Sequence, residues 1–424
     1  MRLGHGLALT GAALLGGVVR PEILWDFANP AAPLPGFSLT RATTGTLRAQ
    51  DGSIPTAAIN EPRYDWTGGT RALLVEPSAT NLALNSGDMS GWVEVSTPTT
   101  ITRPAEPNPF GVGPVSAWAK TDAGNALAAR ATTASVVAGA TYSIWVIAKA
   151  GVTNYLQLLG SGTPFGLNVW ANFNLSTGAI GSVGPGVIGA PKATHLGGGW
   201  YLCEIMGTAT ATVAGNALVV AMIGSMDAVR AASVTGQTGV KLCHAQLEQS
   251  ARTSPIVTGA SAVTRAADSI ASLAMSAIWA AAGSVQGTVV VDVEAGAPNS
   301  TARGYGFNIS DVGNNALNLR LYALGNIDDR ATLFTGDGVS GSSMGIVSAL
   351  RGRQKIAVSY ANGAQPMVSR NGGAPQTHPL VYAHNPANTA LQNLFGAFNG
   401  RVRSLAVYRN AASAAQLQAL SVAA

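Results

Sequence analysis

The fold class is indicated by two stretches of sequence, Tyr142-Ser-Ile-Trp-Val-Ile-Ala-Lys149 and Val169-Trp-Ala-Asn-Phe-Asn-Leu175. Both runs are short, rich in β-branched and aromatic residues, and bounded by Gly, Ser, Thr or Pro, which is the pattern of β-strands. More runs of this kind follow at 155–159, 200–206, 217–223 and 240–247. Short strands at close spacing, with no alternating helices, predict an all-β sandwich or jelly roll.

The region after residue 262 repeats the style. Strands are predicted at 287–294, 317–322, 355–360 and 396–408, with a hairpin turn at Asn371-Gly372 and a short helix at 411–420. We therefore predict two tandem β-sandwich domains, one over residues 86–262 and one over residues 263–424.

The composition of residues 1–85 indicates that this part of the chain attaches the protein to another chain. Residues 3–19 carry no formal charge and are flanked by Arg2 and Arg20. A basic start and an apolar core suit a signal peptide, but the Gly-Gly-Val-Val ending is a poor cleavage site, and a membrane span needs ~20 apolar residues. We expect residues 1–24 to be an apolar anchor buried against another chain, with no membrane span. Residues 25–85 are too poor in apolar mass to fold alone and are predicted as an attachment region.

Composition narrows the function classes. Charged residues are 11% of the chain, against ~25% in ordinary soluble proteins. The net charge is +5 with no basic run, which argues against nucleic-acid binding, since that needs a clustered basic stripe. Cys203 and Cys243 lie in apolar strand-like runs and are predicted to be buried free thiols, not a disulfide framework or a zinc site.

No residues stand out as catalytic. Asp292 and Glu294 share one strand face two residues apart, which gives no cleft for glycoside hydrolysis. No GxSxG, GxGxxG or Walker sequence occurs. The sequence predicts no enzyme, no cofactor and no metal site. One structural Ca²⁺ ion near Asp328-Asp329 is compatible with the Asn/Asp-rich loops, although no DxDxDG loop is present.

Strand alternation indicates a binding surface instead. In residues 169–175, Trp170 shares a face with Asn172 and Asn174, which is the wrong place for a core residue. Sugars stack on aromatic rings while amides and charged groups bond their hydroxyls. We predict a carbohydrate-binding platform. It consists of Trp145, Lys149, Gln157, Trp170 and Asn172. The alternative is that these tryptophans pack against the adjacent domain or another subunit.

Several segments, in their order, resemble phage head-spike and tail-fibre proteins. The first are Phe37-Ser-Leu-Thr-Arg-Ala-Thr-Thr44, Pro62-Arg-Tyr-Asp65 and Leu73-Leu-Val-Glu-Pro-Ser-Ala-Thr-Asn81. Leu39 and Thr40 interrupt that family's first element. Residues 142–151, 199–203, 245–248 and 263–268 are similar to the family's carbohydrate-binding-module-like jelly roll. Residues 398–410 and 415–420 are similar to the end of laminin-G/concanavalin-like sandwiches.

The resemblance implies a virion-surface protein of a phage or gene transfer agent, a head spike or tail fibre that adheres to host capsule polysaccharide. It implies capsid or tail partners at the N-terminus, a homo-oligomer, and localisation at a capsid vertex or tail, extracellular after release. Two other classes stay open. One is a polysaccharide-degrading virion enzyme, and the other is a secreted glycan-binding module, which predicts cleavage of the first ~20 residues.

Overall fold

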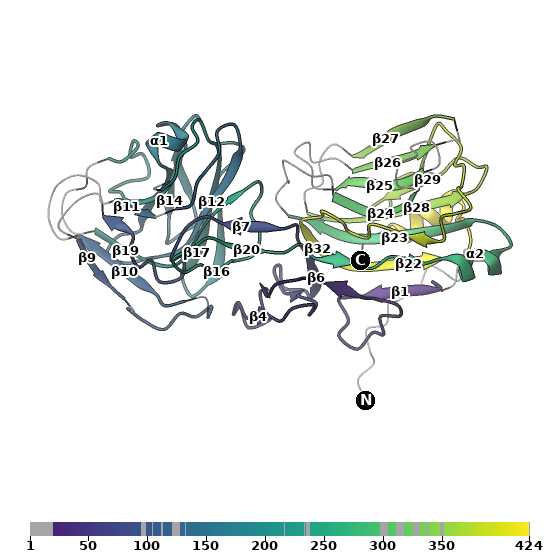
Figure 1. Ribbon diagram of the computed structural model, residues 1–424, viewed down its shortest axis with the longest axis horizontal. Coiled ribbons are helices and arrows are strands. Elements are labelled where there is room, and N and C mark those ends of the chain that lie inside the picture. The colour runs from purple at the N-terminus through teal and green to yellow at the C-terminus, as the bar shows by residue number, and fades with distance from the viewer. Residues whose placement is uncertain are drawn as a thin grey trace. The chain divides into compact units, whose positions relative to one another are not determined.

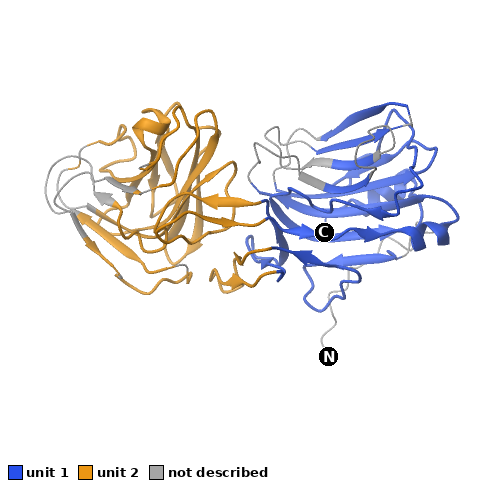
Figure 2. Cartoon of the chain, viewed as in Figure 1, with its two compact units in different colours: residues 1–41, 60–77, 267–424 blue, residues 42–59, 78–266 orange. Residues whose placement is uncertain are grey.

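The chain divides into two compact units (Figure 2). Unit 1 comprises residues 1–41, 60–77 and 267–424, and unit 2 comprises residues 42–59 and 78–266. The computed structural model describes residues 20–94, 99–103, 105–111, 113–120, 128–131, 133–215, 217–232, 234, 238–296, 304–310, 318–324, 331–336, 339–347 and 352–423. Residues 1–19 of the predicted anchor, and Asp328-Asp329, lie outside these ranges.

Unit 2 contains two six-stranded antiparallel sheets (Figure 1). The first, here the β12 sheet, has the order β16-β17-β12-β19-β10-β9. Its strands are β9 (Thr99–Thr102), β10 (Ser116–Lys120), β12 (Thr141–Ala150), β16 (Lys192–Gly197), β17 (Trp200–Thr208) and β19 (Thr238–Gln249).

The second sheet, here the β14 sheet, has the order β15-β14-β13-β18-β11-β8. Its strands are β8 (Val93–Glu94), β11 (Ala128–Ala131), β13 (Tyr155–Gly160), β14 (Trp170–Asn174), β15 (Ile180–Val183) and β18 (Leu218–Met222). Unit 2 also has β3 (Gly45–Thr46) paired with β4 (Thr56–Ala57), β7 (Ala79–Asn81) paired with β20 (Val263–Arg265), and the one-turn helix α1 (Gly162–Phe165).

The core of unit 2 lies between its two sheets. Alternate residues of β12, such as Ile144 and Val146, pack in one cluster with Leu156 and Leu158 of β13 and Phe173 of β14. The intervening residues of each strand therefore point to the outer faces of the sandwich. This confirms the predicted all-β sandwich and the strand faces read from the sequence.

Unit 1 is a second sandwich. Its larger sheet has eight strands in the order β30-β29-β28-β23-β32-β6-β5, with β1 also paired to β32, and its smaller sheet has the order β24-β25-β26-β27. The strands are β1 (Ile23–Asp26), β5 (Tyr64–Asp65), β6 (Ala72–Val75), β23 (Gln286–Ala295), β24 (Gly304–Ser310), β25 (Asn318–Leu324), β26 (Ala331–Gly336), β27 (Gly341–Val347), β28 (Arg353–Ala361), β29 (Met367–Arg370), β30 (Gln376–Thr377) and β32 (Gly400–Tyr408).

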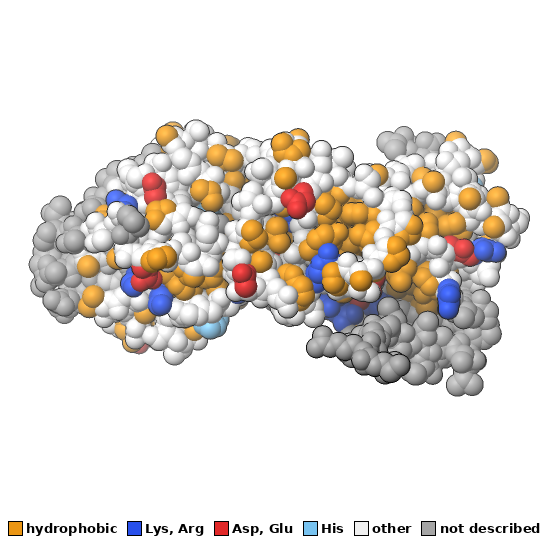
Figure 3. Space-filling view, turned by 90° about the horizontal axis from the view of Figure 1, so that it is seen from below, with side chains coloured by type: hydrophobic (Ala, Val, Ile, Leu, Met, Phe, Trp, Pro, Cys, Tyr) orange, Lys and Arg blue, Asp and Glu red, His pale blue; other side chains and the backbone are white. Residues whose placement is uncertain are grey.

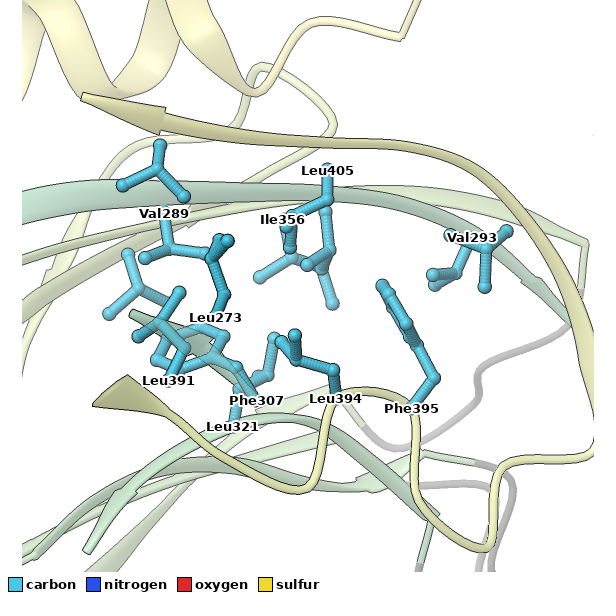
Figure 4. Close-up of a cluster of buried hydrophobic side chains, with 14 of the residues drawn as sticks. Leu273, Val289, Val293, Phe307, Leu321, Ile356, Leu391, Leu394, Phe395 and Leu405 are labelled. Carbon is cyan, nitrogen blue, oxygen red and sulfur yellow. The ribbon is translucent and has the colours of Figure 1, made fainter. Parts of the chain in front are cut away.

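The core of unit 1 fills the space between these sheets (Figure 4). Val289 and Ile356 from the large sheet face Phe307 and Leu321 from the small one, and Phe395 from a connecting segment packs beside them. Two short pairs, β2 (Leu39–Thr40) with β21 (Ser269–Ile270) and β22 (Leu273–Ala274) with β31 (Ala390–Leu391), complete the unit.

Two helices accompany the sheets of unit 1. The predicted C-terminal helix is confirmed as α3 (Ala414–Leu420), and Leu417 packs with Val290 and Ala357 on the outer face of the large sheet. A capping box between Ser413 and Gln416 starts it. Helix α2 (Ser276–Ala282) buries Trp279 and ends at Gly283, whose φ of 69° suits a glycine.

The compact units follow different boundaries from those expected from the sequence. Residues 25–85 are divided between both units rather than forming a region of their own. The reason is β6: all four of its residues are buried, and it pairs with residues 400–402 of β32, far along the chain. Part of the 25–85 segment is thus stabilised by pairing with a strand of the C-terminal sandwich.

A cluster of four buried charges lies in unit 1. Arg63 donates to Glu76 Oε2 at 2.6 Å and to Asp268 Oδ2, and Arg41 donates to Asp268 Oδ1 at 3.0 Å. The backbone amide of Glu76 adds a bond to Asp268 Oδ2 at 2.9 Å. Burial lowers the pKa of Arg63, but Glu76 and Asp268 together raise it above its ordinary value. Two buried guanidinium groups are therefore paired with two buried carboxylates.

Candidate functional site

The five predicted platform residues lie on two different faces of unit 2. Trp145 and Lys149 belong to β12, on the outer face of the β12 sheet. Gln157, Trp170 and Asn172 belong to β13 and β14, on the outer face of the β14 sheet. The expectation of one shared platform is therefore corrected. Alternation along a strand predicts which residues share a face, but not which sheet the strand joins.

Trp145 does not present its ring to solvent, because its side chain is fully buried. Its indole nitrogen donates to Glu248 Oε1 at 3.0 Å, and its ring lies 5.0 Å from that of His244. Ile54 and Phe110, both distant in sequence, complete the apolar cluster around it. Trp145 is thus covered by its own unit, whereas the alternative expected the cover to come from the adjacent domain or another subunit.

Lys149 lies elsewhere on the β12 sheet. Its ammonium is 5.9 Å from the centre of the Trp200 ring, and its side chain is half-buried. Trp200 itself is buried, so this pair offers a cation but no open aromatic face. Lys149 is not brought near Trp170.

Gln157 and Asn172 are buried and bonded to each other and to the loop 225–232. Asn172 Oδ1 accepts from Gln157 Nε2 at 2.7 Å, and Asn172 Nδ2 donates to the carbonyls of residues 226 and 228 at 2.9 and 2.7 Å. Gln157 Nε2 donates to the carbonyl of residue 229 at 3.2 Å, and its Oε1 accepts from the amide of residue 231 at 2.7 Å. Every amide hydrogen of the pair is engaged, so these side chains fix the loop and have no donor left for a sugar.

This arrangement holds Arg230 from both sides. Gln157 bonds the carbonyl before Arg230 and the amide after it. A Cβ built at Gly162 in α1 would lie 3.9 Å from the Arg230 guanidinium and 3.2 Å from Leu167, a side chain that is 64% exposed. No sequence pattern pointed to Arg230, because only the loop's contact with β13 and β14 brings it to this face.

Trp170 retains part of its ring at the surface. One side packs on Leu159, Val219 and Ala221. Another side meets Gly184, where an added Cβ would come within 2.5 Å of the indole nitrogen. A side chain at position 184, just after β15, would therefore collide with the indole and with the Asn168 carbonyl. We call Trp170, Leu167 and the loop 225–232 the Trp170 surface: it joins a fixed aromatic ring, an exposed aliphatic side chain, a guanidinium and the exposed Asp227.

Removing the amide clamp is expected to free the loop. Gln157→Ala leaves the carbonyl of residue 229 and the amide of residue 231 without their partner, at about 1–3 kcal/mol of local stability. Amide hydrogen exchange over residues 226–231 should accelerate by an order of magnitude or more. Asn174→Ala is the control, because Asn174 bonds only its own turn at Ser176 and Thr177. Equal exchange in both variants would contradict the clamp.

Several other ionisable side chains of unit 2 are fully buried. Burial lowers the pKa of His244 to about 4 and raises the pKa of the Cys203 and Cys243 thiols. Both cysteines are buried and free, as predicted. Asp292 is bound through both oxygens by Arg353, and Glu294 is bound by Arg401.

Two further features bear on partners. Within the ranges that the structure describes, no three His, Cys, Asp or Glu side chains group as metal ligands would, and no helix is long and apolar enough to cross a membrane. Figure 3 shows charged side chains thinly scattered among hydrophobic and uncharged ones on the face seen there, with no continuous basic stripe.

Comparison with known proteins gives likenesses to solved structures. No protein-family model and no curated protein sequence matches the chain. The Ruminococcus gnavus IT-sialidase CBM40 bound to α2,3-sialyllactose is similar over 34% of this chain and 86% of its own, at 17% identity and a TM-score of 0.28. Trypanosoma rangeli sialidase in complex with sialic acid is similar over 73% of this chain and 60% of its own, at 9% identity and a TM-score of 0.25. Mouse laminin α1 domains LG4-5 are similar over 70% of this chain and 91% of their own, at 9% identity and a TM-score of 0.20. These are likenesses of fold alone and carry no ligand or activity over to this chain.

Proposed function

We propose that this chain is a structural adhesion protein on the surface of a phage or gene transfer agent particle, a head spike or tail fibre. It binds host surface polysaccharide and does not turn it over. The proposal is supported by the order of the sequence segments that resemble such proteins, and by the two β-sandwich units that those segments build.

The observation that carries glycan binding is the Trp170 surface. Aromatic rings bind sugars through their faces, and a ring that is already fixed loses little conformational entropy on binding. Trp170 is fixed by Leu159 and Val219 beneath it and by Gly184 beside it. The neighbouring loop is fixed by hydrogen bonds from Gln157 and Asn172, and its exposed residues, Asp227 among them, lie beside these two strands. Trp170 is thus the member of the predicted platform best placed for a sugar.

The buried charge cluster supports the family resemblance. The resemblance rests in part on the segments 62–65, 73–81 and 263–268. These segments contain Arg63, Glu76 and Asp268, respectively. These segments meet at one point in unit 1. The three segments therefore form one buried contact, to which each contributes one charged side chain.

Adhesion through a single shallow surface is weak, so the proposal includes a homo-oligomer. Linked copies on one particle raise avidity by ~10²–10⁴ without any new contact. The N-terminal region is proposed to attach the oligomer to the capsid or tail.

Trp170→Ala is expected to lower affinity for the host polysaccharide by about fivefold or more, since stacking on one aromatic ring contributes about 1 kcal/mol or more. The measurement is a capsular-polysaccharide array followed by titration of the positive glycan. Trp66→Ala is the matched control, because Trp66 is also partly exposed but lies in unit 1. Unchanged binding by the Trp170 variant would remove the site.

The particle role is tested separately. Mass spectrometry of purified particles should find the chain, and particles lacking it should lose surface projections while keeping intact heads. A secreted protein that lacks its first ~20 residues would instead identify a secreted binding module. Release of reducing ends from capsule by purified particles would identify an enzyme.

A further inference from the structure

A group of charged side chains lies on the outer face of the large sheet in unit 1, in the part that α3 does not cover. Arg353 and Lys355 extend from β28, Asp292 and Glu294 from β23, and Arg401 and Arg403 from β32. Strand pairing places Asp292 opposite Lys355 on one side and Ser404 on the other. We call this group the basic face.

A β-bulge gives the basic face its shape. The register between β23 and β32 shifts at Asp292 and Val293, so that Val293 pairs with Val402 and Asp292 with Ser404. Arg403 is therefore the extra residue, and a bulge turns two successive side chains to one side of the sheet. Val402 and Leu405 remain in the core, which leaves Arg403 and Ser404 together on the outer face.

The carboxylates of this face are already occupied. Both oxygens of Asp292 bind Arg353, at 2.9 and 2.6 Å. Glu294 binds Arg401, and Asp65 lies 4.0 Å from Arg401 while accepting from the amide of Thr67 at 2.8 Å. Four cations thus share three carboxylates, and the arginines Arg353 and Arg401 hold all three.

Lys355 and Arg403 make no ion pair in the described part of the chain, although Asp292 acts on both from a distance. Within the described residues, the half-buried Lys355 ammonium makes no hydrogen bond or ion pair, and Arg403 donates only to the neutral hydroxyl of Thr70. The Arg403 Nε is buried without a partner. A half-buried cation without a counter-charge is costly, and a bound anion would remove that cost.

The electrostatics agree with the geometry. Burial lowers the pKa of Lys355, and Asp292 offsets this only in part because Arg353 acts against it. Burial, together with the nearby Arg353 and Arg401, also lowers the pKa of Arg403, and Asp292 and Glu294 offset this only in part. Both cations are therefore destabilised in the charged form where they stand.

We propose that the basic face binds the carboxylate or sulfate group of an acidic polysaccharide, with Lys355 and Arg403 as the charged ligands and Ser404 as a hydroxyl contact. This inference rests on the proposed function and names the class of glycan. Two cations with interleaved carboxylates suit a single oxyanion on a sugar ring, whereas a nucleic-acid backbone needs a run of cations along its phosphates.

The test titrates the full chain with oligogalacturonate and with dextran sulfate, using unmodified dextran as the neutral match. We expect both acidic glycans to bind and dextran to bind at least tenfold more weakly. The double variant Lys355→Gln with Arg403→Gln should lose about tenfold or more in affinity for the acidic glycans. The slope of log affinity against log salt should also become shallower. Removing two half-buried, unpaired cations should not lower the melting temperature.

The matched control is Lys192→Gln with Arg409→Gln, because both side chains are exposed and the net charge falls equally. Its affinity should stay within twofold of the parent. Equal loss in the control pair, no loss in the basic-face pair, or no preference for acidic over neutral dextran would each overturn the inference. Inorganic sulfate that binds as tightly as the oligosaccharides would assign a free-anion site instead. If Trp170→Ala loses binding and the Lys355/Arg403 double variant does not, the basic face is not the glycan site. The proposed adhesion role would then still be supported by the Trp170 surface.

Discussion

Replacing Asp268 with alanine is expected to lower the free energy of unfolding by about 3–5 kcal/mol, which is the range for breaking a buried ion pair by removing one partner. Asp268 is bound by Arg41, Arg63 and the amide of Glu76, and all the side chains of this cluster are buried. Without it, the buried Arg41 and Arg63 guanidinium groups each lose a carboxylate partner, and Arg63 keeps Glu76. This loss is a large part of the 5–15 kcal/mol that stabilises a typical domain.

Chemical denaturation measures the change, and hydrogen exchange should locate it in unit 1. Asp51→Ala is the control, because Asp51 is exposed and bonds only Ser53. A loss below 1 kcal/mol in Asp268→Ala would show that water or a rearranged partner replaces the carboxylate. Chain segments that lead to unit 2 leave unit 1 at residues 41, 60, 77 and 267, all within a few residues of the cluster. We therefore also expect poor yields of this variant.

Glu248→Ala is expected to cost about 2–4 kcal/mol, whereas Glu248→Gln should be tolerated. The buried Glu248 carboxyl accepts from the Trp145 indole at 3.0 Å, Gln246 at 2.9 Å, and the Thr253 amide and hydroxyl at 2.9 and 2.7 Å. Three of these donors reach Oε1. A glutamine oxygen can accept all three while its Nε2 donates to the Thr253 hydroxyl, so the amide preserves the network that alanine destroys.

The same carboxyl makes stability depend on pH. Burial raises the pKa of Glu248 above its ordinary value, against the opposing effect of its four hydrogen bonds. The folded state therefore keeps a proton that the unfolded chain releases near pH 4.3. Its stabilising contribution is complete below that pH and is lost as pH rises through the folded-state pKa. Glu248→Gln should match the parent near pH 4 and exceed it increasingly at higher pH. Melting curves of the two proteins that stay parallel from pH 4 to 8 would contradict a buried, protonated carboxyl.

Local patterns were enough for the fold class and for strand faces. Residues 142–149 form β12 with Ile144 and Val146 in the core, and residues 169–175 contain β14 with Phe173 inside and Trp170 outside. The close spacing of turns and the C-terminal helix were also predicted from residues that are close together in the chain. These features depend on backbone geometry and on side-chain period, which a short stretch of sequence contains in full.

The candidate site was only partly predictable. Trp145 is on the outer face, as alternation predicts, yet it is buried because Ile54 and Phe110 cover it. Gln157 and Asn172 are adjacent, as expected for one surface, yet their amides are used up by the loop 225–232. Arg230 gave no sequence signal at all. Each outcome depends on a segment far away in the chain that lies over the strand.

Residue patterns were sufficient to predict that this protein is built of β-strands and to predict the apolar side of the strands in residues 142–149 and 169–175. The pairing of strands into sheets, the covering of outward residues and the meeting of charges became visible only in the folded chain. Arg63, Glu76 and Asp268 look like isolated surface residues until folding brings them together. The physical reason is that side-chain period is a local property, whereas burial and charge pairing depend on contacts between residues separated by up to hundreds of positions.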